Sequence, residues 1–216
     1  MVACGDADGA VTGNTRRFGA SLDKIKQVVD VRDGEIMFGL NMVVHKGKTI
    51  FVGDTSVHEY PTSEQMAEIA ISTARVVRLF GFDPKVAFVS HSTFGQPLTS
   101  RTKHIRNAVD ILKERKVDFE FDGDMQPDVA LNPEYEELYP FSKIVGKANI
   151  LIMPGQHSAA ISYKMMKTLG DTKVIGPLLI GLGLPIEIAP LRSSTSELIN
   201  LASIAAYSAD VIDYKK

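Results

Sequence analysis

The chain has 216 residues, a formal net charge of −2, 44% hydrophobic residues and 23% charged residues. These proportions are ordinary for a globular protein and exclude the low hydrophobicity and high net charge that keep a chain disordered. The balanced charge provides no basic surface for nucleic acid, and the sequence has no apolar run that predicts a membrane span.

The first part of the chain predicts a β-hairpin. Residues 1–4 are typical of the end of a buried strand. The long apolar run at 36–44 then turns at 46–48 into a second strand at 49–53. Two such runs joined by a short turn with a glycine favour an antiparallel pair.

From residue 62 on, helix-like and strand-like segments alternate. A helix is predicted at 62–80, because Thr62 and Gln65 have the spacing of a capping box and Gly81 ends the apolar periodicity. Nearly continuous apolar strands between helices are typical of an α/β protein with three layers, α/β/α, and a mostly parallel sheet. Further strands are expected at 86–90, 118–122, 148–153, 173–175 and 186–189, helices at 100–116, 158–169 and 195–208, and a loop with a helix at 127–138.

Three predicted strands end in loops rich in small and polar residues, at 90–95, 154–158 and 190–195. Ligands bind beyond the carboxyl ends of the strands in parallel sheets. Each loop also leads into a predicted helix, whose first amides favour an anion. The pattern therefore indicates a site for a phosphate-bearing ligand. The alternative for each loop is that its Ser or Thr only caps a helix.

Four side chains in or near these loops are candidates for chemistry. His91 and His157 are candidates for acid–base work near neutral pH, with simple backbone hydrogen bonding as the alternative. Arg192 and Lys164 are candidates for binding phosphate, with solvated surface cations as the alternative. We predict no metal site, because His58 lies in a predicted loop and not at the helical spacing of zinc ligands.

The cysteine content favours a reducing compartment. Cys4 is the only cysteine and cannot form an internal disulfide, so we expect a cytoplasmic protein. The first residues lack the basic and apolar regions of a secretory signal. Because residues 1–4 read as a strand that starts abruptly, we expect the chain to be a piece of a longer one.

Several motifs resemble the phosphate acetyl/butyryl transferases. Their spacing matches over nearly the whole chain. Two further segments, 54–62 and 92–97, resemble in detail the transferase-like C-terminal domain of bacterial NADP-dependent malic enzymes. The family motifs are GDADG at 5–9, PTSEQ at 61–65, FDPKVA at 82–87, SHST at 90–93, DG at 122–123, ALN at 130–132 and IGPLLIGL at 175–182.

The resemblance implies a two-lobed fold related to isocitrate and isopropylmalate dehydrogenases, with acetyl-CoA, CoA and acetyl phosphate bound between the lobes. It implies that residues 1–216 are the C-terminal part of such a domain. They would be mainly the second lobe, at about 15–185, plus the closing helix at 195–208, with the first lobe largely absent. It implies no cofactor in this domain, and NADP and a divalent metal only in an attached malic enzyme part.

The chain departs from the family where catalysis would take place. Active members carry Ser-Arg-Gly after the penultimate strand and an Asp six residues beyond the Arg. Those positions hold Pro190, Leu191 and Glu197 here. Loss of one group that stabilises developing charge costs about 10²–10³ in rate. The other departures are Ser-Ala-Ala at 158–160 for Thr-Gly-Asn, with Tyr163 and Lys164 kept, and Phe94 for a loop glycine.

The resemblance therefore implies a catalytically silent domain that binds acetyl-CoA or a related CoA metabolite and regulates an attached malic enzyme. The alternatives are an active phosphate acetyltransferase, in which Arg192 replaces the lost Arg, and a structural module without a ligand. No nucleic acid or membrane partner is expected. The predicted ligand-side residues are Ser92, Thr93, His157, Lys164, Arg192 and Glu197.

We also expect a homodimer or a higher oligomer. The final helix carries more apolar residues than half a domain needs to bury. The alternative is that this helix packs only on its own lobe. The residues in question are Leu198, Ile199, Leu201, Ile204, Val211 and Ile212.

Overall fold

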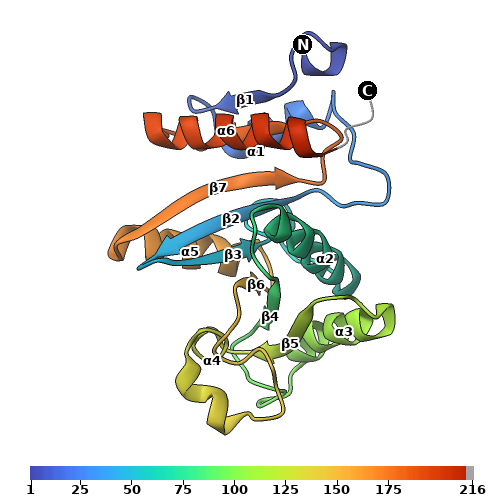
Figure 1. The fold of residues 1–216 in the computed structure, drawn as a ribbon. Coiled ribbons are helices and arrows are strands. Elements are labelled where there is room, and N and C mark those ends of the chain that lie inside the picture. Colours follow the sequence, from blue (N-terminus) through green and yellow to red (C-terminus); the bar gives the residue numbers. More distant parts are fainter. Residues whose placement is uncertain (213–216) are drawn as a thin grey trace.

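The structure is a computed structural model that describes residues 1–212. Helices and strands alternate along most of the chain (Figure 1). The strands are β1 (Ala10–Gly13), β2 (Phe38–His45), β3 (Lys48–Gly53), β4 (Lys85–Val89), β5 (Glu120–Met125), β6 (Ile150–Ile152), β7 (Thr172–Ile180) and β8 (Ile186–Ala189). The helices are α1 (Phe18–Ile25), α2 (Ser63–Leu79), α3 (Ser100–Arg115), α4 (Pro127–Leu131), α5 (Gln156–Leu169) and α6 (Thr195–Val211), with 3₁₀ turns η1 (Val2–Cys4) and η2 (Pro133–Leu138).

Six strands form one sheet in the order β5-β4-β6-β3-β2-β7. The pairs β4–β5, β4–β6 and β3–β6 are parallel, while β2 is antiparallel to both β3 and β7. Lys46 and Gly47 both have positive φ at the tip of the β2–β3 hairpin, as the favoured two-residue hairpin turn requires. The predicted α/β class, with a mostly parallel sheet and an antiparallel hairpin, is confirmed.

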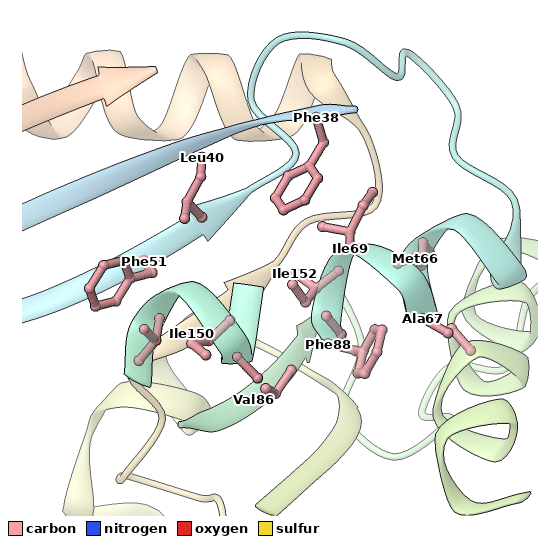
Figure 2. Packing of buried hydrophobic residues seen from close by; sticks show 14 of the residues in the cluster. Phe38, Leu40, Phe51, Met66, Ala67, Ile69, Val86, Phe88, Ile150 and Ile152 are labelled. Atoms are coloured by element: carbon pink, nitrogen blue, oxygen red, sulfur yellow. The ribbon is translucent and has the colours of Figure 1, made fainter. Parts of the chain in front are cut away.

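Helices cover both faces of this sheet, which makes three layers. On one face, α2 and α3 pack their apolar stripes against Phe38, Phe51 and Phe88, all fully buried (Figure 2). On the other face, a second core forms around Leu151 and Ala159, with α4, α5 and the chain between them. Burying strands on both faces explains why these segments read as continuous apolar runs.

A second, two-stranded sheet pairs β1 with β8 in parallel. It lies beyond β7, with α6 alongside it (Figure 1). Leu22 and Ile25 of α1 pack with Ile186 and Ile188 of β8 in a third core. Residues 18–25 therefore pack mainly with β8, in a core that Leu179 at the edge of the large sheet also joins. We call the six-stranded sheet with its helices the large part and β1, β8, α1 and α6 the small part.

Three local predictions differ from the structure. Residues 1–4 form an exposed 3₁₀ turn and not a buried strand, since Gly5 in the left-handed region turns the chain at once. The strand predicted at 173–175 continues to Ile180, because it pairs along the whole of the long strand β2. The sequence analysis also missed β1 and α1, which are short and only partly apolar.

The helix predicted at 62–80 has the expected capping box. The Gln65 amide donates to Thr62 Oγ1 at 3.2 Å, and the Thr62 amide donates to Gln65 Oε1 at 2.8 Å. This fixes the point at which the loop after β3 becomes α2. In the described part of the chain, no helix is long and apolar enough to cross a membrane.

Candidate functional site

Four parallel strands, β3, β4, β5 and β6, end at one edge of the large sheet. The loops that follow them are therefore neighbours in space, although they are far apart in sequence. They are the segments 54–61, 90–97 and 153–155, together with Gln126. This is the edge where parallel sheets place their ligands.

Ser92 is held in a closed hydrogen-bond network. Its side chain has no exposed surface, and its hydroxyl donates to Asp124 Oδ2 while lying 3.2 Å from Ser90 Oγ. The other oxygen of Asp124 accepts from the Gly95 amide at 3.0 Å. Asp124 is itself fully buried. Ser92 therefore fixes the shape of the loop and presents no free group to a ligand in this structure.

Thr93 and Phe94 continue the same loop. Thr93 is nearly buried, and its hydroxyl oxygen accepts from the Gln126 amide at 3.2 Å. Phe94 adopts a φ of 49°, a conformation that suits the glycine expected at this position. Its ring packs 4.9 Å from that of Phe141 and 5.4 Å from that of Tyr139. This aromatic contact offsets part of the backbone strain.

The loop after β3 holds a His–Asp pair that the sequence analysis missed. The buried carboxylate of Asp54 accepts from the amides of Gly39, Ser56, Val57 and His58 at 2.6–3.1 Å. His58 Nδ1 lies 2.7 Å from Asp54 Oδ2. An aspartate at this position fixes the tautomer of the imidazole and leaves Nε2 as an acceptor.

His58 also lies beside the start of α5. The Gln156 amide donates to the His58 carbonyl at 3.1 Å. The signal that was available in the sequence is an Asp directly after a strand and a His four residues later. The sequence analysis treats His58 only as a possible metal ligand and does not connect it with Asp54.

The start of α5 approaches this loop closely. A Cβ on Gly155 would lie 2.3 Å from the Glu59 carbonyl oxygen, so only glycine fits there. In the first turn of α5, His157 Nε2 lies 3.2 Å from Glu59 Oε1, and both side chains are largely exposed. Two turns further on, the Lys164 ammonium lies 5.9 Å from the centre of the Tyr163 ring, whose partial burial raises the pKa of Tyr163.

A recess of about 270 Å³ opens at the same edge, between the loop 60–62 and the start of α3. The Arg101 guanidinium lies over the Tyr60 ring, 5.2 Å from its centre. Pro154 and His104 also line the recess, and His104 Nε2 lies 2.9 Å from the Pro61 carbonyl oxygen. An aromatic ring beside a guanidinium is a surface on which a planar base or an anion can lie.

The loop after β8 is open by comparison. Leu191 is half exposed, and Arg192 is exposed with a φ of 60°. The Arg192 amide donates to the Asn14 carbonyl at 3.1 Å, which joins this loop to the end of β1. Asn14 Oδ1 is buried and has no hydrogen-bond partner among the described residues. A buried oxygen left in this state costs free energy until a donor reaches it.

Glu197 connects the start of α6 to α5. Its carboxylate accepts from Lys167 Nζ at 2.6 Å and from the Ser194 amide at 2.7 Å, while the Glu197 amide donates to Ser194 Oγ in a capping box. The Lys167 bond, followed by the Ser194 amide, lowers the pKa of Glu197 below its usual value. Glu197 therefore stays ionised and is already occupied by two protein partners.

The six predicted ligand-side residues fall into two groups. Ser92, Thr93 and His157 lie at the edge of the large sheet, while Arg192 and Glu197 lie at the start of α6. Helix α5, 14 residues or about 21 Å long, runs from one group to the other and carries Lys164 between them. Within residues 1–212 no three His, Cys, Asp or Glu side chains converge in a way that suits a metal ion.

Comparison with known proteins identifies this arrangement. The profile of the phosphate acetyl/butaryl transferase family matches residues 1–206, so the chain belongs to this family. The NADP-dependent malic enzyme of Rhizobium meliloti (strain 1021) is 47% identical over 209 residues, which are 97% of this chain and 28% of that protein. The similarity is to the transferase-like C-terminal part of that enzyme.

Transferases that stand alone are also similar. The phosphate acetyltransferase of Bacillus subtilis (strain 168) is 31% identical over 211 residues, or 97% of this chain and 65% of that protein. A phosphotransacetylase structure from Streptococcus pyogenes superposes with a TM-score of 0.90 at 30% identity, covering 97% of this chain and 65% of that chain. The chain thus spans less than a third of the malic enzyme and less than two thirds of these transferases.

Proposed function

We propose that the chain is a regulatory, catalytically silent domain of an NADP-dependent malic enzyme, and that it binds acetyl-CoA or a related CoA metabolite. The observation that carries the proposal is the pair Pro190–Leu191 at the carboxyl end of β8. Neither side chain can donate or accept a proton, and neither can stabilise charge on a phosphoryl oxygen. The groups around them can still bind an anion.

The proposed ligand lies along α5. CoA is a long molecule with phosphates at one end and a thioester at the other, and the two groups of predicted residues are separated by the length of α5. Arg192 and Lys164 supply cations for the phosphates. The unpartnered Asn14 Oδ1 supplies an acceptor for a hydroxyl or amide of the ligand. Ser92 and Glu197 hold the loops in shape, and His157 and Thr93 lie at the far end.

Regulation needs only a difference in affinity between two states of the enzyme. A coupling free energy of about 1–3 kcal/mol changes an affinity by roughly 5–150-fold. Binding residues are therefore sufficient for the proposed role, and catalytic residues are not needed. NADP and a divalent metal would belong to the attached malic enzyme part, and we place the protein in the cytoplasm because its single cysteine needs no oxidising compartment.

The test is a calorimetric titration of acetyl-CoA into the full-length protein in phosphate buffer, with a parallel assay for acetyl phosphate. We expect saturable binding, no sustained formation of acetyl phosphate, and at least fivefold weaker binding in Lys164→Ala. The matched control is Lys48→Ala, an exposed lysine at the hairpin turn. Sustained turnover would favour the active transferase instead, and no binding at all would leave a structural module.

We further propose a homodimer formed through α5. Ile161, Met165 and Leu169 are spaced one turn apart and are 57%, 55% and 81% exposed. Helix α6 offers less apolar surface to a partner. Leu201 is buried in the core of this chain, and Leu198 and Ile204 pack against the same core. We expect Met165→Glu to shift the sedimentation coefficient from dimer to monomer, and Ile199→Glu, a change on α6, to leave it unchanged.

A further inference from the structure

A second cavity lies far from the loops described above, between the two sheets. It has a volume of about 330 Å³ and is enclosed by the end of α2, the end of β7 with the following loop, strand β8 and the second half of α6. We call it the Glu187 cavity. Most of its wall is apolar, contributed by residues such as Val76, Phe80, Leu178, Leu182 and Ile204. Its size is within the range of small-molecule pockets in proteins.

One ionisable side chain, that of Glu187, lies among the apolar residues of this wall. Glu187 lies on β8, is only 4% exposed, and lines the cavity. Its Oε2 accepts from the Leu179 amide at 2.9 Å, and no other partner is present among the described residues. Burial raises the pKa of Glu187 to about 8. At neutral pH the carboxyl group is therefore mostly protonated and can donate its proton to an acceptor in the cavity.

The mouth of the cavity is charged, and its charges are paired around one carboxylate. Glu35 accepts from Arg75 Nη1 at 2.9 Å and from Arg32 Nη1 at 3.2 Å. The mouth therefore carries two guanidinium groups beside the Glu35 carboxylate. From α6, Tyr207 is the titratable group that faces the cavity, and its hydroxyl donates to the Leu79 carbonyl at 3.1 Å.

These charges select among ligand types. The Arg32 and Arg75 side chains at the mouth disfavour a cation. The apolar wall around Glu187 disfavours an anion, because a charge buried there loses its water without gaining a cation as a partner. An uncharged molecule with an aliphatic body and one accepting oxygen satisfies both ends of the cavity. It buries apolar surface and gives Glu187 its missing partner.

We propose that the Glu187 cavity is a binding site for a small uncharged carbonyl compound with an aliphatic chain, whose oxygen accepts a hydrogen bond from Glu187. The site is separate from the proposed CoA site and does not depend on it. Binding weakens at alkaline pH, because the ionised carboxylate can no longer donate. The other titratable groups that line the cavity are Arg32, Glu35 and Arg75 at the mouth and Tyr207 from α6.

The experiment is a titration of the full-length protein with hexanamide, followed by NMR of the protein methyl groups at pH 6.5 and pH 9. We expect saturable shifts, with affinity at least fivefold lower at pH 9. Glu187→Gln keeps a donor and the bond to the Leu179 amide, so binding should persist and lose its pH dependence. Ile204→Phe fills the cavity and should abolish binding. Glu114→Gln, an exposed carboxyl on α3, is the control and should behave as the wild type.

Each contrary result overturns the proposal. If the folded wild type gives no saturable shifts, the cavity is filled or closed in the full-length protein. If Ile204→Phe binds as well as the wild type, hexanamide binds elsewhere. If hexylammonium binds more tightly than hexanamide, the proposed class of ligand is wrong. Acetyl-CoA binding, measured in the same samples, reports on the proposed function separately.

Discussion

The loop after β4 and the loop after β8 look alike in sequence and differ in the folded protein. Each follows a buried strand, contains Ser or Thr, and leads into a capped helix. In the first loop the fully buried carboxylate of Asp124 accepts hydrogen bonds from the Ser92 hydroxyl and the Gly95 amide. In the second, Leu191 and Arg192 are exposed, and one backbone bond joins Arg192 to Asn14.

The difference indicates which of the two loops can form new hydrogen bonds when a ligand binds. A loop organised around a buried carboxylate has its polar groups satisfied internally, so it acts as a rigid wall. A loop with exposed side chains and an unsatisfied oxygen beside it can gain hydrogen bonds when a ligand arrives. Sequence motifs alone do not separate these cases, because the partner that closes the first loop comes from β5, more than 30 positions further along the chain.

The largest expected effect on stability is at the loop after β4, which is organised around Asp124. Asp124→Ala should lower the free energy of unfolding by about 4 kcal/mol, because the buried Ser92 hydroxyl and Gly95 amide both lose their acceptor. Urea denaturation followed by circular dichroism measures this. Asp122→Ala, which removes only a bond to the neighbouring Gly123 amide, should cost less than about 1 kcal/mol. Equal losses of unfolding free energy in the two variants would show that the Asp124 hydrogen-bond network does not account for the destabilisation.

The next effect concerns β8, the strand that leads into the open loop. The pKa of Glu187 is raised to about 8 by burial, so the folded state holds a proton that the unfolded state releases above its ordinary value of 4.5. The stability contributed by this group is complete below pH 4.5 and is lost as the pH rises to 8. Between pH 5 and pH 8, the wild type should lose about 3 kcal/mol more than Glu187→Gln.

Denaturation curves at several pH values test this difference. The Gln variant should be the more stable one, and its advantage should grow with pH. Parallel pH dependence in the two proteins would mean that Glu187 is more accessible to water than its buried position indicates.

A smaller effect is expected at the start of α6. Ser194→Ala should reduce stability by about 1 kcal/mol, because the Glu197 amide loses its capping oxygen. Ser196→Ala, at an exposed position of the first turn, is the matched control and should change stability by less than about 0.5 kcal/mol. Thermal unfolding by calorimetry gives both values. A loss of stability as large as that of Asp124→Ala would show that the loop after β8 is as rigid as the loop after β4.

The smallest effect on stability is expected at Arg192. Arg192→Gly should change the free energy of unfolding by less than about 0.5 kcal/mol, because glycine adopts the positive φ at this position without strain. The same variant should bind acetyl-CoA at least fivefold more weakly. Calorimetric titration and urea denaturation of one preparation measure both. An unchanged affinity would remove Arg192 from the proposed site.

Much of the fold was predictable because its signals are local. The hairpin follows from its apolar runs and the Lys46–Gly47 turn, and α2 follows from Thr62 and Gln65. The second half of β7 was not predictable in this way. Gly176 and Pro177 read as a loop, yet the strand continues past them because β2 supplies the partner. A Cβ at Gly176 would lie 2.8 Å from the Leu40 carbonyl oxygen, a contact that only the folded sheet reveals.

The candidate site was predictable only in part. Strand ends before capped helices marked the loops, and the family motifs marked the positions in them. Three buried acids decide what these loops and the cavity can do, namely Asp54, Asp124 and Glu187. The partners of Asp124 and Glu187 lie far away in the sequence, so the sequence does not reveal that these two acids are buried. Asp54 is different, because it precedes its partner His58 by only four residues, and this spacing was the signal that the sequence analysis missed.

The bond between Glu187 and the Leu179 amide joins the two sheets, because one residue lies on β8 and the other on β7. Oε2 accepts this bond whether the carboxyl group is protonated or not. Only the other oxygen changes from donor to acceptor when the proton leaves. The hydrogen bond that joins the large and the small part of the molecule is therefore independent of pH. The ability of Glu187 to donate a hydrogen bond into the cavity depends on pH.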